Sequence, residues 1–170
     1  MYAARALAAL VKHNNHNQSI VTDIGAIPLL VSLLRATNVP SVEAAATGAL
    51  WALSVGNATN QGSVASAGAV SLLVSMLGSR SGEAANLAGN ALSSIGLDNP
   101  AGLREISKML VELMITARRE STQERAAATL WRLVRQNLSQ QLEIAKAGGA
   151  QPLVRLLRDG PPGGRSFALW

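Results

Sequence analysis

The chain has 170 residues, of which 48% are hydrophobic, 15% charged and only 3% aromatic. This balance favours helices that pack through small aliphatic side chains, because few residues here prefer strands. The longest apolar runs, such as AIPLLVSLL, are far shorter than the ~20 residues needed to cross a bilayer, so no membrane span is predicted. The chain contains no cysteine, which excludes disulfides, zinc thiolates and thiol catalysis.

The formal net charge of +5 is dispersed, with most basic residues after Asp98. The second half is therefore the better candidate to meet an acidic partner. Nucleic-acid binding is not expected, because it would need its basic residues in one stripe and would show steep salt dependence with random oligonucleotides. The N-terminal MYAARALAALVKH lacks the features of a signal peptide. We accordingly expect an intracellular protein, cytoplasmic or nuclear.

The first half of the chain predicts a series of helices in a fixed order. An amphipathic helix over YAARALAALVK is followed by a helical phrase, GAIPLLVSLL, at 25–34. A long helix around Trp51 begins near Pro40 and Ser41, which are start signals. After a break at Gly56, a short helix over about 60–67 is expected to end at Gly68, because glycine permits the left-handed turn that stops a helix. The helix AVSLLVSML follows.

The second half repeats this order with one difference. Glycine stands at the corner between the first and second helix of three units, at Gly25, Gly68 and Gly148, whereas the remaining unit has Glu105. A left-handed backbone is costly for a residue with a side chain. We therefore expect LREISKMLVELM to continue as one helix through Glu105, before a helix around Trp131.

The repetition of these phrases indicates a stacked array. GAIPLLVSLL at 25–34 returns in variants at 68–77 and 148–157, and the ALWALS phrase at 49–54 is matched around Trp131. One such unit cannot bury its own apolar face and needs a neighbour. Over essentially its whole length the chain resembles armadillo-repeat proteins. The resemblance implies an all-α, right-handed α-solenoid of about four three-helix repeats, whose third helices (H3) line a concave groove.

We expect a single array over residues 1–170, divided at the corners that open each unit. It would comprise a partial H3 helix at 1–14, repeats at 15–56, 57–97 and 98–138, the last with a weak corner between its first two helices, and a truncated repeat at 139–170. Both ends cut through a repeat, which predicts a fragment of a longer array. Uncapped ends would also favour self-association or packing against another subunit.

In armadillo proteins, a tryptophan on H3 and an asparagine four residues later form parallel ladders that hold a ligand's aliphatic stems and backbone. The tryptophan row here reads Ala8, Trp51, Asn90, Trp131 and Trp170, and the next row reads Lys12, Val55, Ser94 and Arg135. The asparagine ladder is absent and two of its places are basic. By this resemblance, we expect the groove to repel basic peptides and to accept an extended acidic or mixed-charge segment.

The first hypothesis is therefore a non-catalytic protein–protein interaction scaffold with a protein or peptide partner. Its groove candidates are Trp51, Trp131, Trp170, Asn90, Ser94, Lys12, Arg132 and Arg135. The alternative is a structural subunit that docks through its uncapped ends and convex face. In that case the groove is unused, and the tryptophans are partly buried filler between helices.

Catalytic and metal sites find little support in the sequence. His13 and His16 have a possible metal-binding spacing, but no carboxylate or cysteine lies beside them, so a solvated loop is expected. No Gly-rich phosphate loop follows a strand, and no Ser–His–Asp set or carboxylate pair converges. We expect neither catalysis nor a metal or other cofactor.

Overall fold

A computed structural model describes residues 1–135 and 138–159, and of residues 138–140 only the backbone. Helices and short turns make up the described part, which contains no strand. The helices are α1 (Tyr2–Val11), α2 (Asn15–Asp23), α3 (Ala26–Ala36), α4 (Pro40–Ser54), α5 (Ala58–Ser66), α6 (Ala69–Met76), α7 (Gly82–Ile95), α8 (Pro100–Thr116), α9 (Glu120–Val134), α10 (Leu138–Lys146) and α11 (Ala150–Asp159). The all-helical prediction is confirmed.

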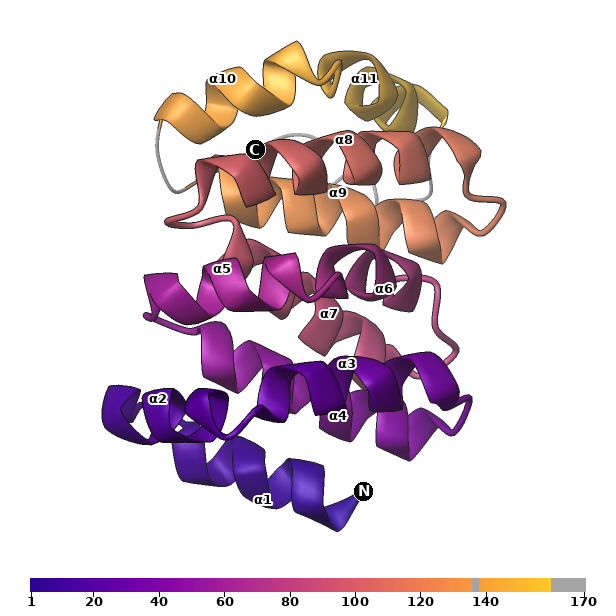
Figure 1. The fold of residues 1–170 in the computed structure, drawn as a ribbon. Coiled ribbons are helices and arrows are strands. Elements are labelled where there is room, and N and C mark those ends of the chain that lie inside the picture. Colours follow the sequence, from indigo (N-terminus) through magenta and orange to yellow (C-terminus); the bar gives the residue numbers. More distant parts are fainter. Residues whose placement is uncertain (136–137, 160–170) are drawn as a thin grey trace.

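The helices stack in layers that follow the chain from one end of the molecule to the other (Figure 1). One wall consists of α1, α4, α7 and α9, each packed on the next. The other wall is formed by α2–α3, α5–α6, α8 and α10–α11, in which α3 contacts α6 and α8 contacts both α6 and α11. This is the predicted α-solenoid, with the H3 helices on one wall. We propose that the repeats divide at 15–56, 57–97, 98–138 and 139–170, as the sequence suggests.

The corners between the first and second helix of a repeat depend on glycine. Gly25, Gly68 and Gly148 adopt left-handed φ values of 84°, 75° and 82°. Glu105 instead lies inside α8, which runs unbroken from Pro100 to Thr116. The predicted continuous helix is confirmed. Among the described residues, the one non-glycine with a positive φ is His13, at 56° in the turn after α1.

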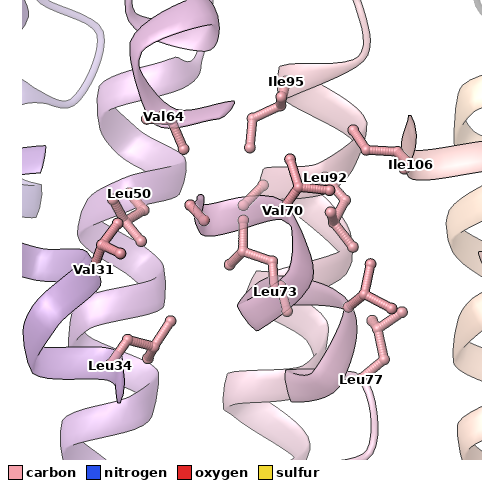
Figure 2. Packing of buried hydrophobic residues seen from close by; sticks show 14 of the residues in the cluster. Val31, Leu34, Leu50, Val64, Val70, Leu73, Leu77, Leu92, Ile95 and Ile106 are labelled. Carbon is pink, nitrogen blue, oxygen red and sulfur yellow. The ribbon is translucent and has the colours of Figure 1, made fainter. Parts of the chain in front are cut away.

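A continuous apolar core lies between the two walls. Figure 2 shows side chains from α3, α4, α6 and α7 filling the space between these helices. Leu50, Leu73, Leu92 and Ile106 are completely buried. Since each repeat supplies only part of this core, burial couples neighbouring repeats and the array is stable only as a stack.

Asparagine and glutamine side chains join the helix ends. Asn14, Asn57 and Asn99 each cap a following helix, accepting a hydrogen bond from the backbone N–H three residues on at 2.9–3.0 Å. Such caps satisfy backbone donors that the helix leaves unpaired. Asn137, 80 residues after Asn57 in the sequence, lies outside the described residues.

Two fully buried glutamines bind the backbone near the ends of the H3 helices. Gln18 of α2 donates from Nε2 to the carbonyl oxygens of Ala52 (2.9 Å) and Val55 (3.1 Å), at the end of α4. Gln61 of α5 donates to the carbonyl oxygen of Ser54 (3.2 Å) and accepts from the backbone N–H of Asp98 (3.2 Å). These bonds fix where α4 and α7 end, and sequence reasoning did not identify them.

Among the described residues, no single helix is long and apolar enough to cross a membrane. The pair α2 and α3, bent by 73°, meets the length and composition test only when the two helices are taken together.

The hydrogen bonds of Gln61 to Ser54 and Asp98, here called the glutamine bridge, should contribute to the free energy of unfolding. Replacing Gln61 by Met keeps the volume but leaves the Ser54 carbonyl and the Asp98 N–H without their buried partner. We expect the free energy of unfolding to fall by about 1–3 kcal/mol, as measured by urea denaturation. Exposed Gln151 is the control, and Gln151→Met should change it by less than about 0.5 kcal/mol. Equal effects of the two substitutions would contradict the bridge.

Two glycine substitutions should act in opposite directions. Gly25→Ala places a side chain at φ 84°, so we expect a loss of about 1–2 kcal/mol in unfolding free energy. Gly62 lies within α5, and a Cβ there would meet nothing within 4 Å. Gly62→Ala should therefore stabilise the protein by about 0.5–1 kcal/mol. Thermal denaturation of both variants measures the difference, and a stabilising Gly25→Ala would be inconsistent with a required left-handed corner.

Candidate functional site

Trp51 of α4 stands between two cavities on the H3 wall. The first, here called the apolar chamber, has a volume of about 410 Å³. Its lining comes from α1, the turn after it, α4 and α7, and consists of Ala8, Ala9, Lys12, His13, Gly48, Trp51, Ala52, Val55 and Leu87. Because alanine, glycine and valine dominate, the chamber offers an apolar surface with Lys12 and His13 as its polar members.

The second cavity, here called the basic chamber, adjoins the first across α4 and has a volume of about 360 Å³. It is lined by Trp51, Val55, Asn90, Ser93, Ser94, Leu97, Arg132 and Arg135. Trp51 and Val55 thus belong to both chambers. All of the helices that contribute, α4, α7 and α9, are H3 helices, so the two chambers form one continuous groove on that wall.

The structure brings together most of the residues that the sequence singled out. The basic chamber contains five of them, namely Trp51, Asn90, Ser94, Arg132 and Arg135. Lys12 lies in the apolar chamber with Trp51. Trp170 falls outside the described residues.

The ring of Trp131 is covered by an arginine side chain. The guanidinium carbon of Arg135 lies 4.6 Å from the centre of its ring, in a cation–π contact. The two residues are four positions apart and α9 continues to the cap at Arg135, which is the spacing that brings helical side chains together. Arg135 is therefore held in place by Trp131 beside the basic chamber.

Arg132 is a charged residue of the site that is partly removed from water. Its side chain is half-buried, and this burial lowers its pKa from the ordinary value, although a guanidinium stays protonated at neutral pH. Within the described part of the chain it makes no hydrogen bond or ion pair. A desolvated cation without a partner is costly, so a bound anion would offset that cost.

Gly89 of α7 makes room for Arg132, a role that sequence reasoning missed. A Cβ at position 89 would lie 2.7 Å from Nη1 of Arg132 and 2.9 Å from Oγ1 of Thr129. Both distances are too short for any residue larger than glycine without a shift. The absence of a side chain at Gly89 thus places the guanidinium of α9 directly against α7.

Polar groups in the basic chamber are also open to a ligand. The side chains of Asn90 and Ser94 are half-buried and have no hydrogen-bond partner among the described residues. The Ser93 hydroxyl, by contrast, donates to the carbonyl oxygen of Gly89 at 2.8 Å. An amide and a hydroxyl in this position could bind the backbone of an extended peptide.

The charge around the groove is predominantly positive. The linings of the two chambers, over the part of the chain that is described, include Lys12, Arg132 and Arg135 but no Asp or Glu. Glu83 and Arg5 line a smaller cavity of about 150 Å³, which shares Ala8, Gly48 and Leu87 with the apolar chamber. The charged side chains that line the two chambers are therefore all positive.

Other features of the described residues do not converge on a second chemical site. A separate cavity of about 250 Å³ lies where α8, α9 and α11 meet, with Glu120, Arg155 and Asp159 in its lining, but it shares no residue with the groove. No group of three or more His, Cys, Asp or Glu side chains that could hold a metal ion occurs in the described ranges.

Solved structures with a similar fold are known. No protein-family model and no curated protein matches the chain. Among solved structures, an engineered protein determined as a structural-genomics target is 27% identical, with a TM-score of 0.72 over 98% of this chain and 69% of its own. A designed armadillo repeat protein in complex with the peptide (KR)4 is 26% identical, with a TM-score of 0.71 over 99% and 72%.

A natural protein shows the same fold. The armadillo-repeats-only protein of Plasmodium falciparum is 19% identical, with a TM-score of 0.67 over 99% of this chain and 76% of its own, and at that identity the likeness concerns the fold alone. These structures superpose on nearly the whole chain, so the stacked helices have the same arrangement in all of them. The chain has the armadillo-repeat solenoid fold of these structures.

Proposed function

We propose that the protein is a non-catalytic scaffold that binds an extended peptide segment of acidic or mixed charge along the groove formed by the two chambers. The observation that carries the proposal is the basic chamber. There, Arg132 is half-buried without a partner in the described part of the chain, and the side chains of Asn90 and Ser94 are open to hydrogen bonding.

Peptide binding as the general role is supported by the solved relatives. Designed armadillo repeat proteins of this fold have been made for modular peptide recognition, and one is bound to (KR)4. That peptide is entirely basic. The groove described above carries Lys12, Arg132 and Arg135, so like-charge repulsion would disfavour such a ligand here. The preferred peptide should instead carry negative charge.

Each part of the groove has a distinct task in this proposal. The Trp51 indole supplies a rigid apolar wall for aliphatic stems. The Asn90 amide and the Ser94 hydroxyl bind the peptide backbone, which gives affinity for an extended chain. Arg132 and Arg135 bind carboxylates, for which the planar guanidinium offers two parallel donors. None of these groups forms a nucleophile–base pair, so binding rather than catalysis is the role we propose.

The alternative, a subunit of a larger assembly, is favoured by a different observation. Large apolar side chains are exposed on the second wall in the first repeat, namely Ile24 at 72% and Leu29 at 70%. In the second repeat, Leu72 is half-buried against the core. Docking through this surface would bury these side chains and leave the groove free. A sedimentation experiment in which Leu29→Ser abolishes self-association would favour this role.

Whether the groove prefers an acidic or a basic peptide can be tested directly. Fluorescein-labelled (DE)4 should bind the full chain at least ~10-fold more tightly than labelled (KR)4 in low salt, a difference of about 1.4 kcal/mol, as measured by fluorescence anisotropy. Arg132→Gln should remove most of this preference, because it removes the desolvated charge. Arg104→Gln is the control, since Arg104 is exposed on α8 in the other wall.

Three outcomes would count against the proposal. Tighter binding of (KR)4 would contradict the acidic preference. Binding of both peptides that is unaffected by Arg132→Gln would place the site elsewhere. Tight binding of a random oligonucleotide with steep salt dependence would instead support nucleic-acid recognition.

A further inference from the structure

The geometry points to a two-part recognition motif in the peptide: an apolar side chain in the apolar chamber and an acidic side chain two positions away in the basic chamber, with Trp51 as the wall between them. This inference rests on the proposed function. It adds which kinds of side chain the peptide must carry, and at what separation.

The apolar chamber is built to take an aliphatic side chain. Its volume of about 410 Å³ lies within the usual range of ligand sites. Small residues on α1 and α4, such as Ala8, Gly48 and Ala52, leave the space open, while Leu87 and Trp51 supply larger apolar surfaces. Filling it with an apolar side chain removes that surface from water, which stabilises the complex in proportion to the area buried.

The basic chamber is built to take a carboxylate. Arg132 lies against α7 in the space that Gly89 leaves, and Arg135 is held over the Trp131 ring. Arg135 is therefore positioned before a ligand arrives, which lowers the entropy cost of binding. Because Arg132 is already half-buried and unpaired within the described residues, a carboxylate gains more there than at an exposed arginine.

The separation of the two chambers fixes the spacing in the ligand. They share Trp51 and Val55, so they adjoin at the C-terminal end of α4 and no further helix separates them. An extended chain advances about 3.3 Å per residue and places side chains i and i+2 on the same face. Two side chains with one residue between them, about 7 Å apart along the chain, can therefore reach both chambers.

Adjacent side chains in the peptide cannot do the same. Residues i and i+1 of an extended chain point to opposite faces, so only one of them could enter the groove. The residue between the two anchors would lie over Trp51, where the open amide of Asn90 can bind its peptide group. This arrangement predicts that the identity of the middle side chain matters little.

A set of short peptides of equal length and flanking sequence tests the motif. The cores are Leu-Gly-Asp, its reverse Asp-Gly-Leu, and three controls, Leu-Gly-Lys, Ala-Gly-Asp and Leu-Asp-Gly. Binding is followed by nuclear magnetic resonance on the labelled full chain, through the Trp51 indole and the Asn90 side-chain amide, which suits weak ligands. The better of the first two cores should have a Kd at least ~5-fold below that of every control, a difference of about 1 kcal/mol.

Matched glycine variants test how the acid is selected. Gly89→Ala should displace the guanidinium of Arg132 and reduce the preference for Asp over Lys to less than about 2-fold, or about 0.4 kcal/mol. Gly82→Ala, on the same helix with nothing within 4 Å of the added Cβ, should leave the preference unchanged. If Gly89→Ala fails to fold by circular dichroism, Arg132→Gln must give the same loss for the inference to stand.

The results separate this inference from the proposed function. If Leu-Gly-Asp and Leu-Gly-Lys bind equally, or if Leu-Asp-Gly binds as well as Leu-Gly-Asp and its reverse, the two-part motif is wrong although the groove still binds peptides. If none of the cores and not even (DE)4 shifts the Trp51 and Asn90 resonances, the groove is not a peptide site and both proposals fail.

Discussion

The close approach of successive H3 helices is the constraint on which the rest of the structure depends. α4 and α7 pack on each other, and both helices bury alanines completely, including Ala46 and Ala49 of α4 and Ala88 and Ala91 of α7. Alanine faces let helix backbones pack at short distance. Larger side chains, such as Trp51 of α4 and Arg132 of α9, line the chambers. The composition rich in aliphatic and poor in aromatic residues thus determines both the stack and the groove.

The second wall holds the H3 helices in register. The buried amide of Gln18 binds the backbone at the end of α4 in its own repeat and accepts a hydrogen bond from Nδ2 of Asn57 in the next. The buried amide of Gln61 joins the end of α4 to Asp98 after α7. The third repeat departs from this scheme twice. Leu103 stands four residues after its capping Asn99, where Gln18 and Gln61 stand after Asn14 and Asn57, and α8 runs straight through Glu105. Apolar burial replaces the amide bridge there, since Leu103 and Ile106 are both buried.

The sequence alone predicted those structural features that depend on residues close together in the chain. A left-handed corner needs glycine, so Gly25, Gly68 and Gly148 and the exception at Glu105 could be predicted. The cation–π contact of Arg135 with Trp131 was predictable too, from their spacing of four residues on a helix, although it was not anticipated. By contrast, the space that Gly89 provides for Arg132 and the partners of Gln61 depend on residues brought together from different repeats. No local pattern encodes those pairings.

Hydrogen–deuterium exchange of the whole chain, with and without saturating (DE)4, tests the central claim most directly, because it locates the ligand without altering any residue. The account predicts that slowed exchange is concentrated in the H3 segments that line the chambers, at residues 48–55, 87–97 and 131–135, with little change in α2, α3, α10 and α11. Protection confined to the second wall, or exchange that (DE)4 leaves unchanged throughout, would contradict it.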